Sequence, residues 1–361
     1  MKIAILGTRG IPNYHGGFEQ FAESLSEYLA DKDHQVTVYN SHQHPYKETT
    51  WKGVNIVHQY DPEYKIGTAG QFIYDLNCIL HSKKQQFDVI LQLGYTSSSV
   101  WNRLFNKEVV IVTNMDGLEW KRSKYNKPTQ KFLKYAEKLA MKHSDFVVAD
   151  SLGIKAYLDK KYHVDSEYIA YGSQLFQNPE EAQIQQYNVQ KGNYNMLIAR
   201  LEPENNIEVI LDGVAKSNSE TDFLVVGKHE TKFGNYLKEK FKNQPSIKFL
   251  GGIYNQNHLD NLRYFSNLYF HGHSVGGTNP SLLEAMGSKA FILAHDNIFN
   301  KSILKENAFY FKTDTDVVEL LALSKTDHLE NVEANFEEIK NKFSADYINS
   351  KYETYLEKCL N

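Results

Sequence analysis

Short apolar runs rich in β-branched residues recur along the chain and alternate with segments of helical periodicity. Several of these runs are apolar without alternation, which is typical of parallel strands covered by helices on both faces. Between the first two runs, apolar residues recur at helical spacing from Phe18 to Leu29, as in an amphipathic helix that packs on a sheet. The pattern predicts an α/β fold of βαβ units, with strands at KIAILG (2–7), VTVYN (36–40), DVILQL (88–93), VVIVT (109–113), DFVVAD (145–150), MLIAR (196–200), DFLVVG (222–227), SIKFL (246–250), NLYFH (267–271) and AFILA (290–294).

The chain is long enough for two domains, since 361 residues exceed the usual size of one. The alternation of strands and helices stops in a Gln- and Asn-rich stretch at 174–193, which we interpret as a linker. This predicts a first domain at 1–173, a second at 194–335, and a charged helical tail at 336–361. The tail either caps the second domain or crosses back to the first. We expect two Rossmann-like, doubly wound parallel sheets facing a cleft, with ligands at the carboxyl ends of the strands.

The composition excludes several classes of protein. A net charge of -4 argues against a nucleic-acid binder, which needs a strongly basic face. The two cysteines, Cys78 and Cys359, lie far apart, which excludes a disulfide scaffold and fits a reducing compartment. No run approaches the roughly 20 apolar residues that span a bilayer, and the first run is too short for a signal peptide. We therefore expect a cytoplasmic protein, and also no metal, since His271 and His273 lack acidic or Cys partners nearby in sequence.

A glycine-rich turn follows the run NLYFH and leads into a helix. Asn279 is a good N-cap and Pro280 suits the first helical position. Exposed amides and the helix dipole make an anion site here, for which a diphosphate is the natural ligand. Glu284, one turn into the helix, is placed to accept hydrogen bonds from ribose hydroxyls. The alternative is a tight turn before an ordinary helix, with Glu284 as a solvated acid.

Arg200 ends the run MLIAR, and a residue at the end of a parallel strand faces the edge where ligands bind. A guanidinium there grips phosphate oxygens bidentately. The alternative is a surface Arg paired with Glu202 or Glu204.

In the first half of the chain, a glycine-containing loop and an aspartate also follow predicted strands. The loop after the first run contains Gly16 and Gly17, which let the backbone approach a phosphate or a sugar unless the loop is merely flexible. It is not GxGxxG, so a dinucleotide fold of the dehydrogenase type is disfavoured. Asp116 follows the run VVIVT, where it either orients an acceptor hydroxyl, contacts a donor sugar, or forms an ordinary Asp-Gly turn.

The segment 121–143 is strongly basic, with Glu137 as its single acid among eight cations. Apolar residues are interleaved with the cations at helical spacing. Such a stretch either contacts anionic lipid headgroups at a membrane surface or is a solvated helix face.

Five segments in order resemble glycosyltransferase family 4, and in particular its bacterial rhamnosyltransferase-like branch: GTRGIPNYHGGFEQFAESL, NMDGLEWKRSKY, the strand ends ADS and AYGS, ARLEPENN, and HSVGGTNPSLLEAM. The resemblance extends over nearly the whole chain. It implies a two-domain GT-B fold and a metal-independent, retaining hexosyltransferase that uses no cofactor. The implied donor is a nucleoside-diphosphate sugar, with dTDP-rhamnose or another deoxyhexose suggested. The implied acceptor is a hydroxyl of a glycan, free or lipid-linked, in bacterial surface polysaccharide or glycoconjugate synthesis.

The resemblance also assigns roles to residues of this chain. Arg200 matches the family's phosphate-binding Arg, and Glu284 matches the second Glu of its E-x7-E motif, which holds the ribose. Asp116 joins Arg200 as a catalytic candidate. The remaining donor-binding candidates are Gly16, Gly17, Gly277, Thr278 and Asn279, and the acceptor-side candidates are Glu19, Asn114 and Trp120.

Three positions depart from the family pattern. Gly276 stands where the first Glu of E-x7-E is expected, Asn205 replaces a Lys, and Asp116 replaces a His. The departures at Gly276 and Asn205 keep open a rival function, that of a catalytically silent nucleotide-sugar-binding assembly protein. A second rival is a sugar-nucleotide epimerase or phosphorylase of the same fold.

Overall fold

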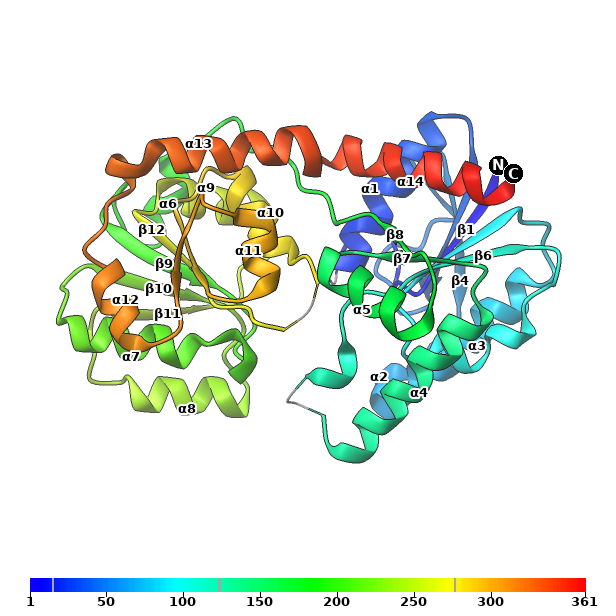
Figure 1. Ribbon diagram of the computed structural model, residues 1–361, viewed down its shortest axis with the longest axis horizontal. Coiled ribbons are helices and arrows are strands. Elements are labelled where there is room, and N and C mark those ends of the chain that lie inside the picture. Colours follow the sequence, from blue (N-terminus) through cyan, green and yellow to red (C-terminus); the bar gives the residue numbers. More distant parts are fainter. Residues whose placement is uncertain (15, 123–124, 276) are drawn as a thin grey trace. The chain divides into compact units, whose positions relative to one another are not determined.

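The computed structural model describes residues 1–14, 16–122, 125–275 and 277–361 (Figure 1). The described residues divide into two compact units. Unit 1 contains residues 1–121, 125–172 and 345–361, and unit 2 contains residues 173–344 together with Arg122. Each unit is built around one mostly or wholly parallel β-sheet, so the expected pair of doubly wound α/β domains is confirmed.

The sheet of unit 1 has eight strands among the described residues, in the order β3-β4-β2-β1-β5-β6-β7-β8. All neighbours pair in parallel except β3 and β4, which are antiparallel. The direction of strand addition reverses between β1 and β5. The strands are β1 (Lys2–Leu6), β2 (Gln35–Ser41), β3 (Thr50–Trp51), β4 (Val54–Gln59), β5 (Val89–Leu93), β6 (Val110–Asn114), β7 (Phe146–Ala149) and β8 (Glu167–Tyr168).

The helices of unit 1 pack their apolar stripes on this sheet. In the first helix, Phe21, Ala22, Leu25 and Leu29 are buried, as the helical spacing predicts. The helices are α1 (Gly17–Asp31), α2 (Glu63–Ile66), α3 (Gly70–Ser82), α4 (Lys127–His143), α5 (Leu152–Tyr162) and α14 (Ala345–Leu360), with 3₁₀ turns η1 (Gly67–Ala69), η2 (Ser98–Val100), η3 (Asn102–Leu104) and η4 (Glu119–Lys121).

Unit 2 repeats this plan with six strands in the order β11-β10-β9-β12-β13-β14, all parallel among the described residues. Here the direction of strand addition reverses between β9 and β12. The strands are β9 (Tyr194–Ile198), β10 (Asp222–Val226), β11 (Ile247–Gly251), β12 (Leu268–His271), β13 (Ile292–His295) and β14 (Phe309–Phe311).

Helices cover the sheet of unit 2 around a core that includes Phe223, Phe270 and Leu211. They are α6 (Ala182–Gln185), α7 (Ile207–Ser217), α8 (Lys232–Lys240), α9 (Gln256–Phe265), α10 (Pro280–Gly287), α11 (Ile298–Leu304), α12 (Asp314–Leu320) and α13 (Leu329–Glu338), with 3₁₀ turns η5 (Pro203–Asn205) and η6 (Lys325–His328) and a π-helical turn η7 (Ile339–Phe343).

The strands expected from the apolar runs are all present, within one to two residues of their expected bounds. Four further strands, β3, β4, β8 and β14, were not expected. Three of them are only two or three residues long. The fourth, β4, alternates buried Val54 and Ile56 with more exposed neighbours, so it lacks a continuous apolar run.

Two segments belong to units that the sequence alone did not assign. The stretch 174–193, expected to be a linker, packs on unit 2: Ile184 is fully buried, and Glu180 N donates to Asn261 Oδ1 of α9 at 2.6 Å. The chain then returns to unit 1 at Ala345. There α14 lies beside α1 (Figure 1), and Asn349 Nδ2 donates to Ser24 O at 3.2 Å.

Among the described residues, no helix combines the length and the apolarity that a membrane crossing requires.

Candidate functional site

The two loops that flank the strand-order reversal of unit 2 meet at the carboxyl ends of β9 and β12. Ligands of doubly wound sheets bind at such a reversal. The loops touch closely, because a Cβ on Gly272, just after β12, would lie 2.0 Å from Asn205 O, just after β9. Asn206 Nδ2 also donates to Gly272 O at 2.8 Å, and Ser274 Oγ donates to Glu204 O at 2.7 Å. The backbone at this edge is therefore fixed before any ligand arrives.

The loop after β12 enters α10 as its sequence predicts. Asn279 has extended backbone angles, and its side chain accepts a hydrogen bond from Ser281 N at 2.9 Å. Pro280 occupies the first turn of the helix. Gly277 is partly buried and Thr278 is buried, while Gly276 lies outside the described residues. The predicted cap is confirmed, and a helix N-terminus opens at the ligand edge of the sheet.

Arg200 follows β9, the strand next to β12, and its side chain is exposed. No carboxylate of the described residues lies within ion-pair distance of its guanidinium, so the alternative pairing with Glu202 or Glu204 is not found. Its main chain is fixed, because Asn205 Nδ2 donates to Arg200 O at 2.7 Å. Asn205 is buried, so the expected Lys is replaced here by a side chain that holds the Arg200 loop.

Glu284 faces a buried cation that the sequence did not suggest. Arg263 of α9 is 1% exposed, and its Nη2 lies 2.5 Å from Glu284 Oε2 while its Nη1 lies 3.0 Å from Asp260 Oδ1. Glu284 Oε1 accepts no hydrogen bond from the described residues and remains available to a ligand hydroxyl. Arg263 occupies a position on the apolar side of α9, next to Leu262 and four residues after Leu259. A charged residue at an apolar helix position is the one sequence signal that could have indicated a buried cation here.

In unit 1, the loop after β1 holds the glycines at the corresponding edge. Gly16 is the extended N-cap of α1 and Gly17 its first residue, and both are exposed. Glu19 is buried, and its Oε1 accepts a hydrogen bond from Arg9 N at 2.9 Å. Gly7 opens the loop with φ +89°, and a Cβ there would lie 2.2 Å from the carbonyl oxygen of Leu93 at the end of β5. The start of this loop is thus held against the end of β5, where the order of strands in this sheet reverses between β1 and β5.

Asn114 and Asp116 lie at the end of β6. Asn114 is buried, and its Nδ2 donates to Tyr352 OH of α14 at 2.8 Å. Its Oδ1 accepts a hydrogen bond from Asp116 N at 2.9 Å, which closes a turn with Asp116 at φ 48°. Asp116 is partly exposed, and Tyr171 OH donates to its Oδ1 at 3.4 Å. Asp116 therefore forms a turn and also presents its carboxylate at the ligand edge of unit 1.

Two side chains of α4 contact the indole of Trp120. Its Nε1 donates to Glu137 Oε2 at 2.9 Å, and Lys134 Nζ lies 4.3 Å from the centroid of its ring. Glu137 is 1% exposed and also accepts from Tyr157 OH, Tyr162 OH and Lys161 Nζ at 2.6 to 2.9 Å. Glu137, the single acid of the basic segment, is thus a buried acceptor shared by four side chains of unit 1. One of its donors is the indole N–H of Trp120, which is therefore already hydrogen-bonded within unit 1.

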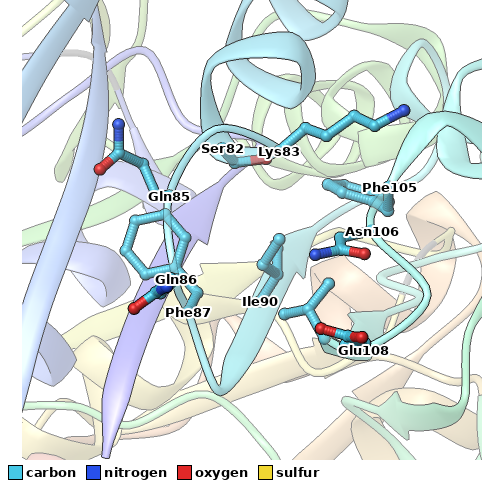
Figure 2. A pocket seen from close by; sticks show the side chains of 10 residues that line it. Ser82, Lys83, Gln85, Gln86, Phe87, Ile90, Phe105, Asn106 and Glu108 are labelled. Carbon is cyan, nitrogen blue, oxygen red and sulfur yellow. The ribbon is translucent and has the colours of Figure 1, made fainter.

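Two other features of unit 1 lie away from this edge. Figure 2 shows a surface pocket lined by residues such as Lys83, Phe87 and Phe105, at the amino-terminal ends of β5 and β6. It is opposite the edge where ligands of such sheets bind.

The described residues also contain one group of possible metal ligands, His34, Glu353 and Glu357. His34 Nε2 lies 3.0 Å from Glu353 Oε1, a contact that joins α14 to the turn before β2.

Comparisons with known families agree with this division of the chain. Residues 179–339 match the family "Glycosyl transferases group 1", and residues 1–174 match a "Domain of unknown function (DUF1972)". The match to "Glycosyl transferases group 1" lies within unit 2. No curated protein matches the sequence.

Several solved structures share the fold. Sucrose-phosphate synthase from Thermosynechococcus elongatus has a TM-score of 0.79 at 15% identity, over 99% of this chain and 98% of that chain. Alr3699/HepE from Anabaena, in complex with UDP and glucose, has a TM-score of 0.75 at 16% identity over 99% of each chain. A trehalose 6-phosphate synthase from Burkholderia multivorans has 0.71 at 10% identity, over 99% and 98%. These likenesses show the fold, which is that of GT-B glycosyltransferases.

Proposed function

We propose that this protein is a glycosyltransferase that moves a sugar from a nucleoside-diphosphate donor to a hydroxyl of a glycan, with retention of configuration and without a metal. The observation that carries the proposal is the edge of unit 2 at the reversal between β9 and β12. There an exposed Arg200 with no carboxylate partner among the described residues stands at the end of one strand. The capped N-terminus of α10 follows the other strand.

These groups suit the negative charge that develops when a sugar leaves a diphosphate. As the bond between the anomeric carbon and the diphosphate oxygen breaks, Arg200 and the amides of Gly277, Thr278 and Asn279 stabilise the departing oxygens. Because this edge is fixed by its own hydrogen bonds, little reorganisation is needed. Glu284 Oε1 is the acceptor we assign to a ribose hydroxyl.

Unit 1 supplies the other residues of the proposal. Gly16 and Gly17 leave open backbone at the start of α1 for the donor sugar and its phosphates, and Asp116 orients the acceptor hydroxyl. Asn114 supports Asp116 through the turn at the end of β6. We assign Glu19 and Trp120 to the acceptor side as supporting residues, because Glu19 is buried and Trp120 donates to Glu137. A deoxyhexose donor such as dTDP-rhamnose, and an acceptor in surface polysaccharide synthesis, complete the proposal.

A thermal-shift screen tests donor binding. We expect one of the UDP-, GDP- or dTDP-sugars to raise the unfolding temperature, because a ligand at about 100 times its Kd stabilises the folded state by roughly 2.7 kcal/mol. HepE, which shares the fold, was solved with UDP-glucose. A screen in which no nucleotide sugar or nucleoside diphosphate shifts the unfolding temperature contradicts the proposal.

The exposed face of α4 supports a second part of the proposal, contact with an anionic membrane surface. Tyr135 is 55% exposed on this helix, while its acid, Glu137, is buried. The exposed charged side chains of α4 are therefore all cationic: Lys127, Lys131, Lys134, Lys138 and Lys142. Each such cation contributes about 1 kcal/mol near an anionic bilayer.

Vesicle co-sedimentation measures this contact. We expect binding to vesicles that contain phosphatidylglycerol, none to pure phosphatidylcholine, and loss of binding at high salt. The triple variant K131E/K138E/K142E is expected to abolish sedimentation, whereas K232E/K238E/K242E on unit 2, also at exposed positions, is expected to leave it intact. Equal binding of both triple variants contradicts a specific role of α4.

A further inference from the structure

Two histidine rings stack at the carboxyl end of β12, beside the proposed diphosphate site. The rings of His271 and His273 have centroids 4.5 Å apart and planes inclined by 20°. His271 is 1% exposed, and both of its ring nitrogens are buried without a hydrogen bond to the described residues. Buried polar atoms are nearly always hydrogen-bonded. Buried imidazole nitrogens without a partner among the described residues, at the ligand edge of a sheet, therefore mark a place where a ligand can bind.

The two ring nitrogens of His273 have different surroundings. Nδ1 is buried and has no partner among the described residues, whereas Nε2 makes no hydrogen bond with them and retains contact with solvent. The main chain is fixed, since His273 O accepts from Asn297 Nδ2 at 3.0 Å and from Asn300 Nδ2 at 3.1 Å. The ring of His273 is held in place by its stacking on the ring of His271. Nε2 is thus the nitrogen that a ligand can reach.

Burial and nearby positive charges keep the ring of His273 neutral. Burial, together with the positive charges of Arg200 and Arg122, lowers the pKa of His273 to about 3. Burial also holds the pKa of His271 well below its usual value, with smaller effects from His273 and Arg263. A neutral imidazole carries one proton, and placing it on the buried Nδ1 would leave a buried N–H without an acceptor, which costs free energy. The proton therefore belongs on Nε2, where it faces the ligand.

We propose that His273 is a further diphosphate-binding residue, whose Nε2–H donates a hydrogen bond to a phosphate oxygen of the bound nucleotide beside Arg200. Phosphate oxygens only accept hydrogen bonds, so they match a donor that adds no charge next to a guanidinium. The inference rests on the proposed function, because it uses the same site at the reversal between β9 and β12.

Two substitutions of His273 distinguish a role of Nε2 from a role of Nδ1. The amide nitrogen of Gln reaches the position of Nε2, whereas that of Asn reaches only the position of Nδ1. We expect His273→Asn to weaken the binding of UDP, GDP or dTDP, and of inorganic diphosphate, by about tenfold or more, because hydrogen bonds to charged groups are the strong ones. His273→Gln is expected to restore most of the affinity. His163→Asn, at an exposed histidine of unit 1, serves as the control. Isothermal titration measures all four proteins.

A second readout uses the unmodified protein labelled with ¹⁵N-histidine. We expect the Nε2 resonance of His273 to move when inorganic diphosphate is added, and the ring to stay neutral from mildly acidic to mildly basic pH. Affinities of His273→Asn within twofold of the wild type, or an unmoved resonance, overturn this inference and leave the proposed function standing. A wild-type protein that binds none of the four probes overturns both. If His273→Asn does not fold, the resonance alone decides.

Discussion

Replacing Arg200 with Ala is expected to lower the rate of sugar transfer by about 100-fold or more, while the protein stays folded. Removing one preorganised group that stabilises developing negative charge typically costs this much. The guanidinium is exposed, so its loss leaves no cavity and no unpaired buried charge. Steady-state kinetics with the donor found in the thermal-shift screen measure the effect, and the unfolding temperature reports on the fold.

Two further variants show whether the effect is specific to Arg200. Arg200→Lys keeps the charge but loses the bidentate fork, so we expect an intermediate rate. Arg103→Ala removes an exposed Arg from η3 of unit 1, and we expect it to leave the rate unchanged. A near-normal rate in Arg200→Ala contradicts its assignment to the diphosphate.

Replacing Glu284 with Ala is expected to destabilise unit 2 by about 3–5 kcal/mol, because it breaks a buried ion pair and leaves the second charge in place. The remaining charge is that of Arg263, which is 1% exposed and would keep Asp260 as its one carboxylate partner among the described residues. Burial raises the pKa of Asp260, so that carboxylate is itself a poor replacement. For a unit of this size, the unfolding temperature should fall by roughly 10 °C.

Glu333→Ala is the matched control for this prediction. It removes the exposed carboxylate of a pair with the partly buried Lys289, whose Nζ lies 2.7 Å from Glu333 Oε2. Exposed pairs contribute about 0–1 kcal/mol, so we expect little change. Calorimetry that shows equal, small shifts for Glu284→Ala and Glu333→Ala would mean that the pair with Arg263 does not hold α9 to α10. Glu284 would then have only the ribose role that we propose.

Local patterns account for much of the fold. Continuous apolar runs predict the central strands because these strands are buried on both faces, as in β5 and β12. The cap of α10 is likewise predicted by Asn279 and Pro280, since capping depends on adjacent residues. Strands β4 and β8 are not predicted, because they have few buried positions.

Long-range contacts explain what sequence patterns could not show. Arg263 precedes Glu284 by 21 residues and lies on another helix, so their ion pair depends on how α9 packs against α10. Glu137 similarly collects donors from η4 and α5. Asn205, which the sequence presents as a lost charge, has its own role in holding the Arg200 carbonyl. The candidate anion groups could thus be named from the sequence, but their partners could not.

Donor-dependent transfer to an acceptor tests the central claim most directly. The protein is incubated with UDP-, GDP- and dTDP-sugars labelled in the sugar, with and without a lipid-linked glycan extract, and both products are measured. The proposal predicts that one donor releases its nucleoside diphosphate and labels the glycan lipid only when the extract is present, and that Arg200→Ala lowers both signals by about 100-fold or more. Conversion of the nucleotide sugar without any extract would indicate an epimerase. Tight nucleotide binding with no labelled glycan from any donor would contradict the account.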